Sequence, residues 1–306
     1  MERSKPSSAP AAVEGLTHRL AGAPISWGVC EVPGWGFQLA PDRVLAELAG
    51  LGFTALERGP QGFLPDDAGT RGALLARHGL RLVASFVPAV LHERSRRQAE
   101  LEGVEEAARV LGEGGGEVLV LAAATGRDGY EAGGPLSEDE WRALFEGLEA
   151  SARIAERHGL ALAVHPHYGT VIEDGGQVGR LLEGSGVDLC LDVGHLAVAG
   201  ADALEVARRA EGRIRHVHLK DVDASVAERV RAREMGYHEA VRAGLYRPLG
   251  EGASRIRETV ALLEASGYHG WYVLEQDVVL SAEPPAGAGP VLDVERSLAF
   301  LRSLGA

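Results

Sequence analysis

Four polar side chains stand where four short apolar segments of the sequence end. They are His165 after LALAV, Asp192 in VDLCLD, His218 in HVHL and Glu275 in WYVLE. Each segment is short and rich in aliphatic residues, so each is predicted to be a buried strand. If these strands belong to a parallel barrel, their carboxyl ends meet at one mouth and the four side chains converge there.

This set of side chains suits a divalent cation. Asp192 and Glu275 supply two negative charges, and His165 and His218 supply neutral nitrogen donors. Carboxylate and imidazole ligands suit Mn²⁺, Co²⁺, Zn²⁺ or Fe²⁺ better than a metal that requires thiolates. We expect Mn²⁺ or Co²⁺, with Zn²⁺ or Fe²⁺ as the alternatives.

The HPH sequence leaves a choice between two imidazoles. His165 and His167 are two residues apart, so on a strand they point the same way. We favour His165 as the metal ligand and His167 as a contact to the substrate. Taken singly, each candidate also has a structural explanation; Asp192, for example, could cap the helix that follows it. Four such residues at the ends of four consecutive strands favour the metal site.

The apolar segments alternate with helical segments along the chain. Glycines at 52, 79, 159 and 267 precede strands, as expected of residues that end helices in the left-handed conformation. Eight strands alternating with helices predict a closed (β/α)₈ TIM barrel. An open doubly wound sheet is the alternative, but no GxGxxG motif follows an early strand. The predicted strands are 21–26, 53–57, 81–87, 117–122, 160–165, 187–192, 214–219 and 271–275.

The barrel is expected to form one domain over residues 20–306, with a polar, flexible N-terminal arm at 1–19. The connection between the last two strands is long. Its residues 221–252 include a charged helical stretch and are predicted to form a lid over the mouth, the alternative being a surface helix without a role.

Composition excludes several classes of protein. The 306-residue chain is 45% hydrophobic with a formal net charge of −13, which disfavours a nucleic-acid-binding surface. No apolar run approaches the ~20 residues that span a membrane, and the N-terminus lacks the apolar segment of a signal peptide. The two cysteines have no CxxC spacing. A cytoplasmic protein acting on a small polyol or keto-sugar is expected, with a homodimer or homotetramer as the assembly.

Several motifs resemble known proteins. LDVGH at 191–195, HVHLKD at 216–221 and VLEQ at 273–276 are similar to the xylose isomerase-like barrel superfamily of sugar isomerases, epimerases and type IV apurinic endonucleases. APISWGVCEVPGWG, HPHYGTVIED and VRAGLYRPLGEG more narrowly resemble the inosose dehydratases of inositol catabolism. The resemblance covers nearly the whole chain after the N-terminal arm.

The resemblance implies a ligand order of Glu, Asp, His and Glu, which falls here on His165, Asp192, His218 and Glu275. The histidine at the first position is a departure. Related epimerases are thought to use both glutamates as bases, whereas a dehydratase needs one base and one acid. The departure therefore favours a lyase.

The implied reaction is metal-assisted loss of water from 2-keto-myo-inositol through an enediolate, giving a trihydroxycyclohexane-dione. Glu275 or Glu57 is expected as the base, and His195 or Lys220 as the acid. His167, His195 and Lys220 are also expected to contact the substrate.

Trp27 and Trp35 could form a wall for the flat face of the ring, or could be packing residues. The main alternative function is a ketose or hydroxypyruvate isomerase or epimerase. A DNA-repair endonuclease and a sugar-binding barrel without activity are further alternatives.

Overall fold

Eight parallel strands close into a barrel in the computed structural model, which describes residues 16–127 and 134–304. The strand order around the barrel is β1-β10-β7-β6-β5-β4-β3-β2. This confirms the predicted (β/α)₈ barrel, with a strand in each of the eight predicted segments. The barrel strands are β1 (Leu20–Gly22), β2 (Ala55–Glu57), β3 (Arg81–Ala89), β4 (Val118–Ala123), β5 (Ala161–Val164), β6 (Asp188–Asp192), β7 (Ile214–Leu219) and β10 (Tyr272–Leu274).

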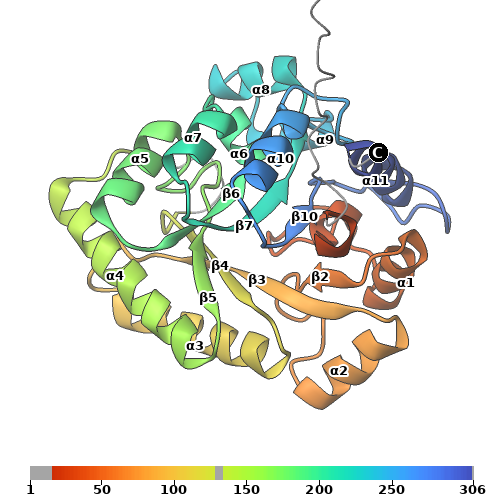
Figure 1. The fold of residues 1–306 in the computed structure, drawn as a ribbon, viewed down its shortest axis with the longest axis horizontal. Coiled ribbons are helices and arrows are strands. Elements are labelled where there is room, and N and C mark those ends of the chain that lie inside the picture. The colour runs from red at the N-terminus through yellow and green to blue at the C-terminus, as the bar shows by residue number, and fades with distance from the viewer. Residues whose placement is uncertain (1–15, 128–133, 305–306) are drawn as a thin grey trace, which may run out of the picture.

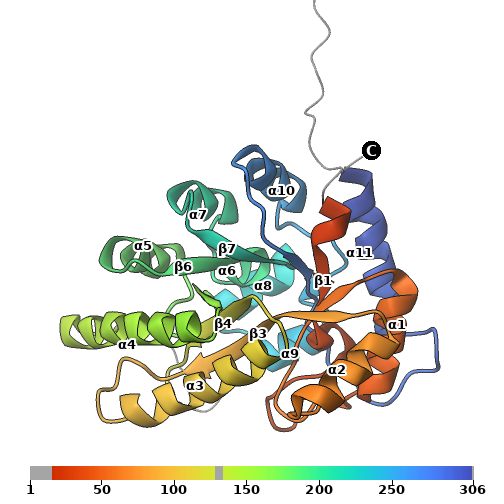
Figure 2. The ribbon, with the colours of Figure 1, turned by 60° about the horizontal axis from the view of Figure 1, so that its bottom comes forward.

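Helices surround these strands (Figures 1 and 2). Most of them return the chain from the carboxyl end of one strand to the start of the next, as a parallel barrel requires. The α-helices are α1 (Pro41–Leu51), α2 (Ala68–Arg77), α3 (Arg97–Glu113), α4 (Glu138–Arg157), α5 (Gly175–Gly184), α6 (Val193–Val198), α7 (Ala203–Arg209), α8 (Ala224–Arg231), α9 (Tyr237–Arg242), α10 (Ile256–Ala265) and α11 (Pro290–Leu304).

Local sequence signals set the ends of these helices. Ser137 and Glu140 form a capping box at the start of α4. The glycines at 52, 79, 159 and 267 all have φ between 64° and 90°, the left-handed region that glycine adopts without strain. Helix α4 buries the apolar side chains of Trp141, Leu144 and Leu148 against the barrel.

The first strand is shorter than its prediction of 21–26. It ends at Gly22, and Pro24 starts the short 3₁₀ helix η2 (Pro24–Trp27). Proline fixes a φ that suits the first turn of a helix and lacks the N–H that a strand would use.

Residues 1–15 of the predicted N-terminal arm lie outside the described residues. Within 16–19 the chain forms the 3₁₀ helix η1 (Leu16–Arg19), and Leu16 is fully buried in the core. No helix in the described ranges is long and apolar enough to cross a membrane.

The long connection after β7 folds into a small layer of its own. Strands β8 (Asp221–Val222) and β9 (Tyr246–Arg247) pair antiparallel, with α8 and α9 between them. The predicted helical stretch divides at Arg233, whose φ of 58° is left-handed. The layer packs a second apolar cluster, in which Tyr237 and Tyr246 lie with Trp35 of the first connection.

The Asp221 carboxylate holds the two ends of this insertion together. Its oxygens accept hydrogen bonds from the backbone amides of Gly250, Gly252 and Ser254 at 2.9–3.0 Å. A Cβ at Gly252 would lie 2.4 Å from Asp221 Oδ1, so only glycine fits there. The role of residues 221–252 as a lid stays a prediction.

Candidate active site

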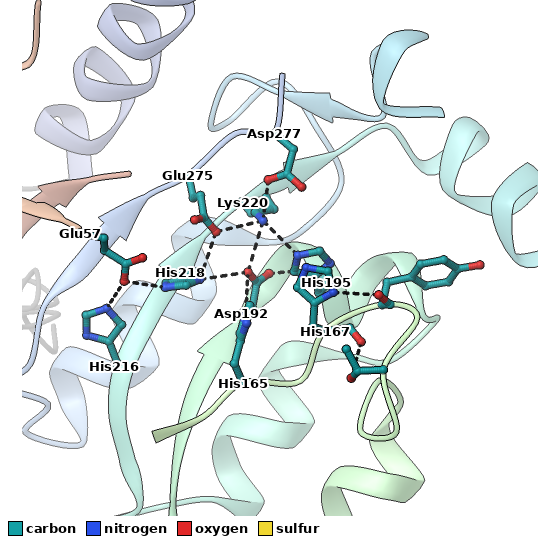
Figure 3. Close-up of polar contacts among 12 residues, drawn as sticks. Glu57, His165, His167, Asp192, His195, His216, His218, Lys220, Glu275 and Asp277 are labelled. Atoms are coloured by element: carbon teal, nitrogen blue, oxygen red, sulfur yellow. Dashed lines mark hydrogen bonds and ion pairs between the residues drawn. The ribbon is translucent and has the colours of Figure 1, made fainter. Parts of the chain in front are cut away.

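A cavity of about 430 Å³ opens at the carboxyl end of the barrel strands, a size suited to a small ligand. Polar side chains from five strand ends gather at it (Figure 3). Those that line it are Glu57, His165, His167, His195, His218, Lys220, Glu275 and Asp277. The sequence had assigned all of these to the site except Asp277.

Asp192 lies at the centre of the group and has two functions. Its Oδ1 accepts a hydrogen bond of 2.7 Å from the backbone amide of His195, so it does cap helix α6. Its Oδ2 faces inward, 3.2 Å from His165 Nε2 and 3.4 Å from His218 Nδ1. Burial raises the pKa of Asp192, but the charges of Lys220 and its neighbours outweigh this and lower it well below the usual value.

Packing against Lys220 explains the glycine in the sequence DVGH. A Cβ at Gly194 would lie 2.6 Å from the Cβ and Cγ of Lys220. Glycine at this position therefore lets the first turn of α6 pass directly against the Lys220 side chain.

His218 is held by carboxylates on both sides. Register places it beside Asp192 in the β6–β7 pair. Its Nε2 lies 3.0 Å from Glu57 Oε1, which also lies 2.8 Å from His216 Nε2. Its Nδ1 makes no hydrogen bond, yet it lies 3.1 Å from Glu275 Oε2 and 3.4 Å from Asp192 Oδ2.

This arrangement fits a cation. If the Nε2 proton of His218 is donated to Glu57, the Nδ1 lone pair faces the two carboxylate oxygens of Asp192 and Glu275. A nitrogen and two oxygens that accept but cannot donate, brought together in a buried place, are what a divalent ion requires. Glu57 would then orient the imidazole, as carboxylates do behind metal-bound histidines.

The ligand atoms of Asp192, His218 and Glu275 lie within 4.8 Å of one another. A second such group contains His165, Asp192 and His195 and so adjoins the first through Asp192. The structure thus brings together the four residues predicted as ligands. Cys190 Sγ lies within 4.8 Å of ring nitrogens of His165 and His218, but burial raises the pKa of its thiol to about 11, which disfavours a thiolate ligand.

Lys220 is the buried cation of the site. Its Nζ lies 2.9 Å from Glu275 Oε2, 2.8 Å from Asp277 Oδ1 and 3.6 Å from Asp192 Oδ2. Burial lowers the pKa of Lys220, but these three carboxylates outweigh it and raise the pKa well above its usual value. Burial raises the pKa of Glu275, but the charges of His218 and Lys220 outweigh this and lower it to about 2.

The two histidines at the outer side of the site are uncharged. The rings of His167 and His195 lie 3.8 Å apart between centroids. Burial lowers the pKa of His167 to about 3, and burial together with His167 and Lys220 lowers that of His195 well below its usual value. His167 Nδ1 lies 2.8 Å from the carbonyl of Tyr168.

Trp27 is not at the cavity. It is fully buried in the main core, and its Nε1 donates a hydrogen bond of 2.7 Å to Glu47. The predicted contact with substrate is therefore corrected: η2 turns this side chain toward α1, and Trp35 is the tryptophan that lines the cavity.

Three residues of the site were missed from the sequence. Asp277 follows Glu275 by two residues, as Lys220 follows His218, and this spacing could have identified it. Tyr237 and Tyr246 lie in the insertion, and Tyr246 Oη approaches His195 Nδ1 at 3.4 Å. No local sequence signal connects these tyrosines to the barrel.

Comparisons with known proteins agree with the barrel fold. The model of the family "xylose isomerase-like TIM barrel" matches residues 45–304. The inosose dehydratase of Geobacillus kaustophilus is 32% identical over 283 residues, which cover 89% of this chain and 90% of that protein.

Solved structures share the fold at lower sequence identity. D-allulose 3-epimerase from Methylomonas sp. has a TM-score of 0.68 at 16% identity, covering 94% of this chain and 97% of the other. The probable 3-DHS dehydratase of Bacillus anthracis has a TM-score of 0.66 at 14% identity, covering 92% and 98%.

Proposed function

The chain belongs to the inosose dehydratases within the xylose isomerase-like TIM barrels, and from this we propose that it removes water from 2-keto-myo-inositol. The observation that carries the proposal is the buried Lys220 ammonium 2.9 Å from the Glu275 carboxylate, inside the cavity. An elimination needs a base and an acid on one substrate, and these two groups stand side by side.

The metal ligands in this proposal are Asp192, His218 and Glu275, with His165 as the fourth. When bound there, Mn²⁺ or Co²⁺ would stabilise negative charge on a ketone oxygen as a Lewis acid. Glu57 and His216 hold the His218 ring in place rather than acting on the substrate. Glu57, considered as a base from the sequence, accepts from both imidazoles and is assigned to this orienting role.

Glu275 is the base and Lys220 the acid. The Glu275 carboxylate takes the proton from the carbon next to the ketone, which leaves an enolate. Lys220 then donates a proton to the hydroxyl on the following carbon as its C–O bond breaks. Water leaves, and the resulting enol tautomerises to the trihydroxycyclohexane-dione.

His195 was the other candidate for the acid. Its low pKa leaves it without a second proton near neutral pH, so it accepts from Lys220 at 3.1 Å instead of donating to substrate. The composition also supports lysine in this role. The chain contains 29 arginines and only two lysines, Lys5 and Lys220. Arginine cannot give up its proton in a protein, whereas a lysine ammonium can.

His165 supports a lyase over an epimerase. Epimerisation through two bases would need a second carboxylate at this position, on the opposite face of the substrate carbon. An imidazole with a pKa lowered mainly by burial, 3.2 Å from Asp192, supports the role of a metal ligand instead. A cytoplasmic location and a dimeric or tetrameric assembly belong to the proposal as expectations.

The test is a substrate panel. Protein loaded with Mn²⁺ or Co²⁺ is incubated with 2-keto-myo-inositol, D-fructose and D-allulose, and the products are identified by mass spectrometry and NMR. We expect one product, lighter than 2-keto-myo-inositol by one water. Interconversion of the ketohexoses with the inosose untouched would support the epimerase and reject the dehydratase.

A further inference from the structure

A closed ring of four hydrogen bonds and one ion pair joins the insertion to Lys220. From Lys220 Nζ the contacts run to His195 Nε2 at 3.1 Å, and from His195 Nδ1 to Tyr246 Oη at 3.4 Å. Tyr246 Oη and Tyr237 Oη lie 2.8 Å apart, and Tyr237 Oη donates to Asp277 Oδ2 at 2.9 Å. Asp277 Oδ1 closes the ring at 2.8 Å from Lys220 Nζ.

The direction of donation in this ring is fixed by Lys220 and by Asp277. An ammonium group can only donate and a carboxylate can only accept. Lys220 therefore donates to His195 Nε2, which places the imidazole proton on Nδ1 and toward Tyr246. Since Tyr237 donates to Asp277, Tyr246 donates to Tyr237. Each of the five groups in the ring is thereby given one orientation.

Two of the five groups come from the insertion. Tyr237 starts α9 and Tyr246 starts β9, both in the insertion, whereas Lys220 and Asp277 follow β7 and β10. None of the five is more than 8% exposed, so water does not compete freely for these bonds. The Lys220 ammonium also lies 5.0 Å from the centre of the Tyr246 ring, within reach of a cation–π contact.

We infer that Tyr237 and Tyr246 are positioning residues, which hold the Lys220 ammonium in place through His195 on one side and Asp277 on the other. This inference rests on the proposed role of Lys220 as the acid. It gives the insertion a definite role, because the insertion supplies the two hydroxyls that fix the hydrogen-bond orientation of His195 and Asp277. If either hydroxyl is removed, the ring is broken. The Lys220 ammonium then keeps its charge but is no longer held in a single orientation.

The experiment removes one oxygen at a time. Tyr246→Phe and Tyr237→Phe are each expected to lower kcat on 2-keto-myo-inositol about tenfold, since one lost hydrogen bond is worth roughly that factor. KM and the affinity for Mn²⁺ should change less than threefold. Tyr268→Phe is the matched control, because its buried hydroxyl donates to the Trp271 carbonyl at 2.7 Å, before β10 and away from the mouth.

A second readout needs no substrate. Nitrogen-15 NMR of the Zn²⁺-loaded protein, with the His195 signal assigned by a His195→Gln variant, reports which ring nitrogen carries the proton. The wild type should have it on Nδ1, with Tyr246 Oη as its acceptor. In Tyr246→Phe the proton should stay on Nδ1, because Lys220 still donates to Nε2, but its resonance should shift and its exchange with water should become faster because the acceptor is gone. An Nδ1 proton whose resonance and exchange are the same in Tyr246→Phe as in the wild type would contradict the inference. Equal kcat in both tyrosine variants and the Tyr268→Phe control would overturn the inference.

The two readouts separate the inference from the proposed function. If the wild type does not dehydrate inosose, the proposed function fails and the NMR readout alone tests the ring. A proton on Nδ1 in the wild type that exchanges faster with water in Tyr246→Phe then supports the ring, and a proton on Nε2 in the wild type rejects it.

Discussion

Replacement of Lys220 by methionine tests the electrostatics of the site most sharply. Methionine keeps the length of the side chain and removes its charge. The Asp192, Glu275 and Asp277 carboxylates, 2.8–3.6 Å from Nζ in the wild type, would then face one another without the ammonium between them. At an effective dielectric constant of 20, unit charges ~4 Å apart interact by about 4 kcal/mol.

Three results follow from this charge balance. The metal-free variant should lose roughly 3–5 kcal/mol of unfolding free energy, the usual cost of removing one partner of a buried ion pair. Its affinity for Mn²⁺ should rise at least tenfold, because the ion replaces the missing charge. Its kcat on 2-keto-myo-inositol should fall by about 10²–10⁴, the contribution of a general acid.

Urea unfolding with and without Mn²⁺, calorimetric titration of the metal and steady-state kinetics measure these three quantities. Arg71→Met is the matched control. Arg71 is a buried cation on α2 that donates to the carbonyls of Pro65, Asp66 and Val110 and does not line the cavity. It should lower stability while leaving metal affinity unchanged. Metal affinity that is unchanged or weaker in Lys220→Met, or kcat within threefold of the wild type, would refute the reasoning.

Four further substitutions examine other parts of the structure. Glu57→Gln should weaken Mn²⁺ binding about 10–100-fold, since the carboxylate that orients His218 is lost, and unchanged binding would remove that role. His165→Ala should weaken Mn²⁺ binding while His167→Ala mainly raises KM; the reverse pattern would exchange their roles. Asp221→Asn should cost about 1–3 kcal/mol and make the insertion sensitive to limited proteolysis, because an amide cannot accept all the backbone donors that the carboxylate holds.

Much of the barrel could be predicted because each strand carries its own signal. An apolar run that follows a glycine and ends in a polar residue is a local pattern, and it located the strand carrying Asp192 to within one residue at each end. The same pattern led to the four candidate ligands, since the topology of a parallel barrel brings all strand ends to one mouth. The predicted end of strand β1 was wrong because Pro24 starts a helical turn that hydrophobicity does not reveal.

The roles of individual residues within the site could not be predicted from the strand pattern. Glu57 looked like a base from its place at a strand end, but the structure turns it toward His216 and His218. Trp27 looked like a substrate contact, but it faces the core. These outcomes depend on the direction of a single side chain, which the strand pattern does not specify.

The insertion was the hardest part to predict from the sequence. Tyr237 and Tyr246 reach the site only because α8 and α9 fold back over the barrel and because the Asp221 carboxylate closes the loop. Such contacts join residues that are distant in sequence, and no periodic pattern in the sequence predicts them. Asp277 differs, since its spacing from Glu275 is itself a strand alternation.

The central claim, that a metal at Asp192, His218 and Glu275 supports dehydration, is tested most directly by metal titration. Protein stripped with a chelator is titrated with Mn²⁺ while the diketone formed from 2-keto-myo-inositol is followed by absorbance, in the wild type and in Asp192→Asn. We predict no activity in the stripped enzyme, activity that rises in proportion to bound metal up to one ion per chain, and none in the variant at any occupancy. Full dehydratase activity in the stripped wild type would contradict the account.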